Sequence, residues 1–278
     1  MITAHDYPSA LFAERAGVEC VLVGDSLAMV AMGLSSTTQV TMEAMIHHSL
    51  SVSRGLTHPF LIADLPFGSY EVSPAQAVSS SLRMIAEGHV EAVKIEGGWE
   101  MEDTVRAITR VGVPVLGHIG LTPQRASQLG GFRVQGRTAE KVLPLLRSAL
   151  ALQRAGCFAI VIECVPPAVG TLLTQRLSIP TIGIGAGNGT SGQVLVQNDM
   201  LGMFDGFTPK FCKKFANIAP EAVTALSTYR DAVKARAFPA PEHDYAMEKG
   251  EEKKLQEAVE RWEREEGSEF DLAWKNDG

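Results

Sequence analysis

Short apolar runs, rich in valine, isoleucine and leucine, recur through residues 1–200, and each ends in a polar or glycine-rich turn. Runs that are apolar at every position are typical of parallel strands buried on both faces of a sheet. We therefore predict eight strands: Ile2–Ala4, Cys20–Val23, Phe60–Ala63, Ala92–Ile95, Val113–Gly117, Ala159–Ile162, Thr181–Ile184 and Val194–Val196.

Helix signals fill most of the gaps between these runs. Ser73 before Pro74 predicts a capped helix start, and the apolar periodicity continues to Gly88. Residues 42–54 and 138–155 are amphipathic, and each is followed by a glycine, as helices often are. Strands and helices therefore alternate along the chain.

This alternation predicts an α/β fold, a (β/α)8 TIM barrel over residues 1–240, with a doubly wound open sheet as the alternative. Only residues 188–193 separate the last two strands, too few for a crossover helix. We expect either an irregular barrel at this point or one miscounted strand.

Charge divides the chain unevenly. The 278 residues carry 25 basic and 32 acidic side chains, a net charge of -7. The stretch 241–278 alone has this net charge, which leaves residues 1–240 neutral. We interpret it as an acidic C-terminal extension with a solvated helix, whose apolar positions are Leu255, Val259 and Trp262.

Composition also excludes several classes of protein. There is no basic footprint for nucleic acid, and no apolar run approaches the roughly 20 residues that span a bilayer. The four cysteines form no C-x-x-C pair, which favours reduced thiols in an intracellular protein. We expect a soluble, cytoplasmic chain, or a mitochondrial one if a targeting segment precedes residue 1.

Ionisable residues gather at the ends of the predicted strands. Because barrel active sites lie where the strands end, these side chains are expected to converge on one mouth. They are Asp25, Asp64, Lys94, Glu96, His118 and Glu163. Lys94 and Glu96 are two residues apart on one strand and so face the same way.

This set suggests chemistry on a keto acid. The oxygens of Asp25, Asp64 and Glu96 suit Mg²⁺, which can chelate a 2-keto acid and stabilise its enolate as a Lewis acid. Lys94 and the Ser26 hydroxyl could bind the substrate carboxylate. Glu163, flanked by apolar residues, is the candidate general base, and we assign His118 only a possible accessory role.

Structural explanations remain open for each residue alone. An aspartate at a strand end often caps the next helix, and a Lys94–Glu96 pair is often a structural ion pair. The glycine-rich segment 183–189 could cradle a phosphate or simply permit a sharp turn. The segment 130–137 is a candidate lid.

Several motifs resemble those of the ketopantoate (3-methyl-2-oxobutanoate) hydroxymethyltransferase family, in order over residues 2–240. They include VGDSL at 23–27, ADLPF at 63–67, VKIEGG at 93–98, GHIGLTPQ at 117–124 and IECVP at 162–166. The resemblance implies a Mg²⁺-dependent barrel enzyme of pantothenate synthesis. It implies transfer of a one-carbon unit from 5,10-methylenetetrahydrofolate to 3-methyl-2-oxobutanoate, giving 2-dehydropantoate.

The resemblance also implies roles for matching residues. Asp25 and Asp64 correspond to metal ligands, Glu96 to a metal-site residue acting through water, and Glu163 to the proton acceptor. Contacts to the keto acid are implied for four residues: Asp25, Ser26, Asp64 and Lys94. Family members form homo-oligomers, commonly decamers, and usually carry a helix ahead of the first strand, which this sequence lacks.

The sequence leaves two rival functions to compare with this one. A lyase of the phosphoenolpyruvate mutase and isocitrate lyase type shares the barrel logic, but its K-x-C-G-H pattern is absent from this sequence. An inactive paralogue serving as a binding module is the second rival, although every expected site residue is present.

Overall fold

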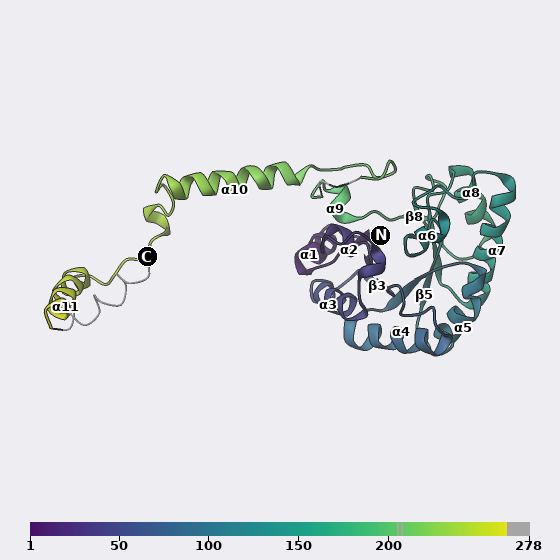
Figure 1. Cartoon of the computed structure of the whole chain (residues 1–278), viewed down its shortest axis with the longest axis horizontal. Helices are drawn as coiled ribbons and strands as arrows, with labels where there is room; N and C mark the ends of the chain where they lie inside the picture. Colours follow the sequence, from purple (N-terminus) through teal and green to yellow (C-terminus); the bar gives the residue numbers. More distant parts are fainter. Residues whose placement is uncertain (205, 207, 266–278) are drawn as a thin grey trace. The chain divides into compact units, whose positions relative to one another are not determined.

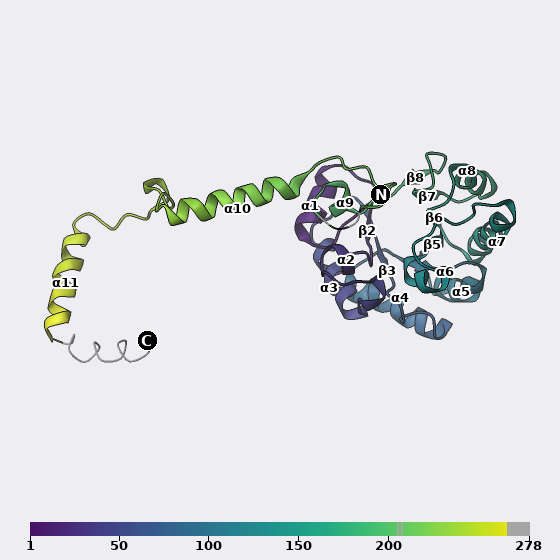
Figure 2. The ribbon, with the colours of Figure 1, turned by 45° about the horizontal axis from the view of Figure 1, so that its top comes forward.

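The computed structural model describes residues 1–204, 206 and 208–265, and the chain divides into two compact units, Met1–Ala219 and Pro220–Gly278 (Figures 1 and 2). The expected boundary at residue 240 stays a prediction. The last part of the expected extension, residues 266–278, lies outside the described residues. No helix in the described part of the chain is both long and apolar enough to cross a membrane.

A sheet of eight parallel strands forms the centre of the first unit, with the strands paired in chain order. The strands are β1 (Ile2–Thr3), β2 (Cys20–Val23), β3 (Phe60–Asp64), β4 (Ala92–Glu96), β5 (Val115–Gly120), β6 (Ala159–Glu163), β7 (Thr181–Ile184) and β8 (Gly192–Gln193). Ile2 forms a parallel bridge with Leu195, and the Thr3 N–H donates to the Leu195 carbonyl at 3.2 Å. Since the chain after β8 thus meets β1, the TIM-barrel prediction is confirmed, and the open-sheet alternative is wrong.

The barrel is irregular between its last two strands, as the short spacing predicted. Residues 185–191 connect β7 to β8 without a helix. The expected strand at 194–196 is wrong in position, because the paired residues of β8 are Gly192 and Gln193. Leu195 instead contributes the single bridge to β1.

Helices wrap the outside of the barrel (Figure 1). The longer ones are α1 (Tyr7–Arg15), α3 (Met42–Ser53), α4 (Pro74–Gly88), α5 (Glu102–Arg110), α7 (Ala139–Ala155) and α8 (Pro167–Arg176). Short ones are α2 (Leu27–Val30), α6 (Ala126–Leu129) and α9 (Gln197–Met200), and 3-10 turns lie at Thr37–Gln39, Trp99–Met101, Pro123–Arg125 and Pro241–His243. The expected cap is present, since the Ser73 side chain accepts from the Gln76 N–H of α4.

Two apolar clusters hold this unit together. One fills the barrel itself, with Ile62, Leu116 and Val161 among its members. The larger one, which includes Val93 and Ile160, packs the strands against the surrounding helices. Strands buried on both faces in this way explain the continuous apolar runs in the sequence.

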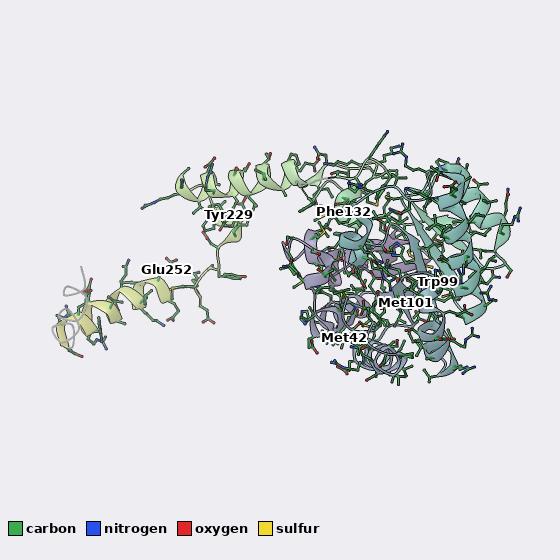
Figure 3. All side chains as sticks on the ribbon, turned by 45° about the vertical axis from the view of Figure 1, so that its right-hand side comes forward. Met42, Trp99, Met101, Phe132, Tyr229 and Glu252 are labelled. Carbon is green, nitrogen blue, oxygen red and sulfur yellow. The ribbon has the colours of Figure 1, made fainter. Side chains whose placement is uncertain are left out.

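The second unit contains α11 (Glu251–Glu265), which carries Leu255, Val259 and Trp262, and nearly all of α10 (Ile218–Lys234), a helix that the sequence patterns did not predict. Side chains of α10 are mostly exposed, among them Tyr229 (Figure 3). The Tyr229 ring packs edge-on against Phe238, with ring centroids 5.6 Å apart.

Gly120, at the end of β5, allows β5 to lie close to β6, the strand that carries Glu163. Its φ is +94°, and a Cβ there would lie 2.2 Å from the Glu163 carbonyl oxygen. Gly112 has a similar φ of +90° but nothing within 4 Å. We predict that Gly112→Ala costs about 1–3 kcal/mol from backbone strain.

Gly120→Ala should cost at least about 2 kcal/mol more than Gly112→Ala, because β5 and β6 must move apart. Urea unfolding of both variants measures the difference in free energy of unfolding. Equal losses of the free energy of unfolding in the two variants would show that the close approach of Gly120 to Glu163 does not add to the cost of the Cβ.

Candidate active site

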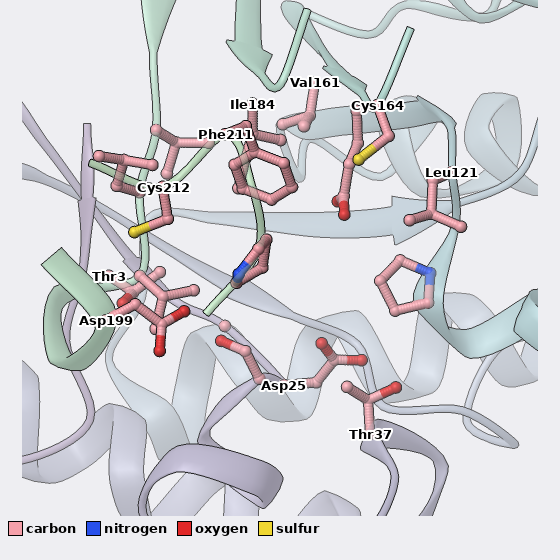
Figure 4. A pocket seen from close by; sticks show the side chains of 18 of the residues that line it. Thr3, Asp25, Thr37, Leu121, Val161, Cys164, Ile184, Asp199, Phe211 and Cys212 are labelled. Atoms are coloured by element: carbon pink, nitrogen blue, oxygen red, sulfur yellow. The ribbon is translucent and has the colours of Figure 1, made fainter. Parts of the chain in front are cut away.

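The polar strand ends meet on one pocket of about 410 Å³ (Figure 4). Asp25 follows β2, Asp64 ends β3, and Lys94 and Glu96 lie on β4. The strands β5 and β6 supply His118 and Glu163. These six residues and Ser26 all line the pocket, so the structure brings together every residue that the sequence singled out.

Neither aspartate acts as a conventional helix cap. Asp64 accepts from the backbone N–H of Asp25 at 2.9 Å, whereas α4 is capped by Ser73. The Asp25 carboxylate accepts from a side-chain amide. Ser26 stands at the start of α2, but its hydroxyl makes no capping hydrogen bond. The helix-capping explanation therefore fails for both carboxylates, and the Ser26 hydroxyl is free for a ligand.

A buried lysine balances part of the negative charge. The Lys94 ammonium lies 2.8 Å from Asp64 Oδ1, and both side chains are almost fully buried. Burial alone would lower the pKa of Lys94, but the carboxylates of Asp64, Glu96 and Asp25 raise it above its ordinary value. Lys94 is thus a fixed cation, and its ion pair is with Asp64 rather than with Glu96.

The pocket holds more carboxylates than buried cations, and the effect is strongest on the pKa of Asp25. Burial, followed by the charges of Asp64 and Glu96, raises its pKa well above the ordinary value. Two further carboxylate oxygens, Asp64 Oδ1 and Glu96 Oε1, are buried and lack a well-aligned hydrogen bond, although Lys94 and His118 lie 2.8 and 3.5 Å from them. A bound cation would offset the repulsion among the carboxylates and let Asp25 ionise.

The oxygens present fit Mg²⁺, which takes one or two protein carboxylates and keeps several waters. In residues 1–204, 206 and 208–265, no three His, Cys, Asp or Glu side chains are arranged to enclose an ion. Water and substrate would therefore complete the coordination shell. Asp25, Asp64 and Glu96 are the carboxylates of the pocket that would hold such an ion.

His118 stands between two carboxylates. Its Nε2 lies 3.1 Å from Glu163 Oε2, and its Nδ1 lies 3.5 Å from Glu96 Oε1 and 3.3 Å from Lys94 Nζ. Burial and Lys94 would lower the pKa of His118, but Glu163 and Glu96 outweigh them and raise it to about 9. The imidazole thus forms a close ion pair with the Glu163 carboxylate, which is the more exposed of the two side chains.

Two site residues, Gln124 and Tyr70, were missed as functional residues by the sequence analysis. The Gln124 amide donates to Asp25 Oδ2 at 2.8 Å and to the Leu65 carbonyl at 3.0 Å, while its backbone N–H donates to Glu96 Oε2 at 3.0 Å. The Tyr70 hydroxyl donates to the Gln124 side-chain oxygen and so fixes the direction of the amide. The buried network therefore orients both Asp25 and Glu96.

We predict that Gln124→Leu weakens Mg²⁺ binding about 10- to 100-fold, because an outer partner of a metal-site carboxylate is lost. Tyr70→Phe, which keeps the packing and removes one hydroxyl, should weaken binding less. Isothermal titration calorimetry with MgCl₂ measures both dissociation constants. Unchanged affinity in Gln124→Leu would contradict the orienting role.

Glycines in the segment 183–189 are required by packing. A Cβ at Gly185 would lie 2.8 Å from the Phe211 ring, and one at Gly187 would lie 2.6 Å from Pro167. These close contacts favour the sharp-turn explanation over the phosphate cradle. The candidate lid does contribute to the site, since Phe132 and Val134 line the pocket.

The fold and site together define a TIM-barrel enzyme with a carboxylate-rich centre at the carboxyl ends of its strands. Residues 1–241 match the family model described as ketopantoate hydroxymethyltransferase. The chain therefore belongs to the ketopantoate hydroxymethyltransferase family.

Two relatives illustrate the match. A protein of Emericella nidulans named 3-methyl-2-oxobutanoate hydroxymethyltransferase is 55% identical over 261 residues, which is 93% of this chain and 75% of that protein. One of the same name from Heliobacterium modesticaldum is 52% identical over 248 residues, covering 89% of this chain and 90% of its own.

Solved structures share the fold at low identity. Phosphonopyruvate hydrolase in complex with oxalate and Mg²⁺ matches with a TM-score of 0.57 at 13% identity, covering 95% of this chain and 93% of that chain. Phosphoenolpyruvate phosphomutase of Streptomyces platensis subsp. rosaceus has a TM-score of 0.56 at 18% identity, with the same coverage. These enzymes share only the barrel fold with this chain. The family match is to the hydroxymethyltransferases.

Proposed function

We propose that this protein transfers a hydroxymethyl group from 5,10-methylenetetrahydrofolate to 3-methyl-2-oxobutanoate, giving 2-dehydropantoate for pantothenate and coenzyme A synthesis. Family membership supports the reaction. The observation that carries the proposal is the convergence of Glu163 with Asp25, Asp64 and Lys94 on one pocket.

Each residue has a defined task in this reaction. Asp25 and Asp64 would hold Mg²⁺, with Glu96 acting through a water. When bound, Mg²⁺ supplies Lewis-acid polarisation of the keto acid. Lys94 and Ser26 bind and orient the substrate carboxylate.

Glu163 then accepts the proton from C3 of the keto acid, and the His118 imidazole holds the glutamate in position. Water adds to the methylene carbon of the folate, both C–N bonds of that carbon break, and the two protons of the water go to the folate nitrogens, so that tetrahydrofolate and formaldehyde form. The C3 carbanion then forms a carbon–carbon bond to the formaldehyde carbon, and the resulting alkoxide takes back the proton that Glu163 accepted. Because the inner pocket excludes most solvent, the charges of Lys94 and Asp64 act at short range and low dielectric.

The test incubates the purified protein with 3-methyl-2-oxobutanoate, 5,10-methylenetetrahydrofolate and MgCl₂, and follows 2-dehydropantoate by mass spectrometry. The proposal predicts product formation that stops with excess EDTA and returns with Mg²⁺. A folded protein that binds the keto acid yet forms no product under these conditions would favour the inactive paralogue.

We also propose that the chain assembles as a homo-oligomer, a decamer by family likeness, and acts in the cytoplasm or the mitochondrion. Light scattering after size exclusion tests the assembly. A monomer at micromolar concentration would contradict it.

A further inference from the structure

Asp199, in α9, is a carboxylate in the active-site pocket that the reaction above does not use. It is 8% exposed and lines the same pocket as Asp25 and Glu163. Its side chain makes no hydrogen bond or ion pair with any described residue, and Lys214 influences it only through its charge. The Asp199 oxygens stay accessible from the pocket, since neither is among the fully buried oxygens without a partner. A ligand that carries hydrogen-bond donors can therefore pair with them in place of water.

The place of Asp199 in the pocket fits a second ligand. In the close-up, Asp199, Thr3 and Cys212 stand on one side of the pocket, and Cys164, the residue after Glu163, stands on the other (Figure 4). Phe211 and Ile184 form part of the wall. A cavity of about 410 Å³ is larger than a small keto acid needs, so part of it remains for the one-carbon donor.

A metal ion is a poor occupant for this position. Asp199 belongs to no group of three His, Cys, Asp or Glu side chains suited to an ion in the described part of the chain. An apolar, aromatic wall with one unsatisfied acceptor suits a flat heteroaromatic ring that carries hydrogen-bond donors.

We infer that Asp199 binds the one-carbon donor by accepting hydrogen bonds from the 2-amino group and the adjacent ring N–H of its pteridine. This inference rests on the proposed function. The two donors lie side by side on one planar edge and match the two oxygens of a carboxylate, as a guanidinium does. Phe211 then offers an aromatic face for the ring.

The ionisation of Asp199 is compatible with this role. Burial raises the pKa of Asp199 above its ordinary value, and Lys214 opposes the rise. Hydrogen bonds from a ligand favour the ionised form of a carboxylate.

The test is a cycle that pairs a change in the residue with a change in the ligand. Tetrahydrofolate and its 2-desamino-2-methyl analogue are titrated anaerobically by calorimetry into the wild type, Asp199→Asn and the control Asp103→Asn. Asp103 is exposed on α5, so Asp103→Asn makes the same chemical change at a surface position. Asp199→Ser repeats the test if Asp199→Asn does not fold.

The wild type and Asp103→Asn should bind the analogue at least about tenfold more weakly than tetrahydrofolate, as expected for losing a hydrogen bond to a charged acceptor. Asp199→Asn should bind tetrahydrofolate at least about tenfold more weakly than the wild type and distinguish the two ligands by less than about threefold.

Two results overturn the inference in different ways. If Asp199→Asn keeps the full discrimination of the wild type, the assignment of Asp199 is wrong while the proposed function stands. If the wild type binds neither ligand, with the keto acid present or absent, the proposed function fails together with the inference.

Discussion

Glu163→Gln should abolish exchange of the C3 proton of 3-methyl-2-oxobutanoate for deuterium, with a rate loss of about 100- to 10,000-fold. The amide has nearly the shape of the carboxylate but no basic oxygen to accept the proton. NMR in D₂O with MgCl₂ and no folate follows the loss of the C3 signal. Omitting the folate isolates proton removal from the later transfer.

Glu100→Gln provides the matched control for this variant. Glu100 pairs with Arg125 outside the set of residues that line the pocket. The control should exchange at the wild-type rate. Exchange that persists unchanged in Glu163→Gln would show that another group is the base.

Lys94→Met should reduce the free energy of unfolding by about 3–5 kcal/mol, because it leaves buried carboxylates without their cation. Lys94 lowers the pKa of Asp25, so its removal raises that pKa further. The native variant then binds more protons than its unfolded state, and its stability should fall as the pH rises from about 5 to 8. Urea unfolding in EDTA at several pH values measures this trend.

The double variant Lys94→Met/Asp64→Asn is the control for Lys94→Met. Removing both partners of the 2.8 Å ion pair should cost less than removing Lys94 alone. If the double variant loses as much free energy of unfolding as Lys94→Met and Asp64→Asn lose in sum when each is measured alone, the two side chains are not coupled.

Much of the barrel could be predicted from the sequence because buried parallel strands leave a local signature. The apolar runs of β2, β4 and β6 match the observed strands closely, and each reaches the pocket through a polar residue at or just after its end. The position of β8 was not predictable. Its pairing depends on contacts with β7 and β1, which no local pattern records.

The sequence could predict which residues form the candidate site, but not which of their side chains contact one another. Lys94 and Glu96 share a face of β4, as their spacing requires, yet Lys94 pairs with Asp64 on the neighbouring strand. Gln124 appeared in the sequence only as the last residue of the motif at 117–124, because its role comes from hydrogen bonds to residues far away in the chain. Asp199 gave no signal beyond its place at the end of the last apolar run.

The proposed reaction requires one cation held by Asp25 and Asp64 within reach of a keto acid that faces Glu163. A crystal structure with Mn²⁺ and 3-methyl-2-oxobutanoate, using anomalous scattering to find the metal, tests this claim most directly. We expect an anomalous peak bounded by the carboxylates of Asp25 and Asp64, with C3 of the keto acid in contact with the Glu163 carboxylate. A peak elsewhere on the chain, or a keto acid whose C3 points away from Glu163, would contradict it.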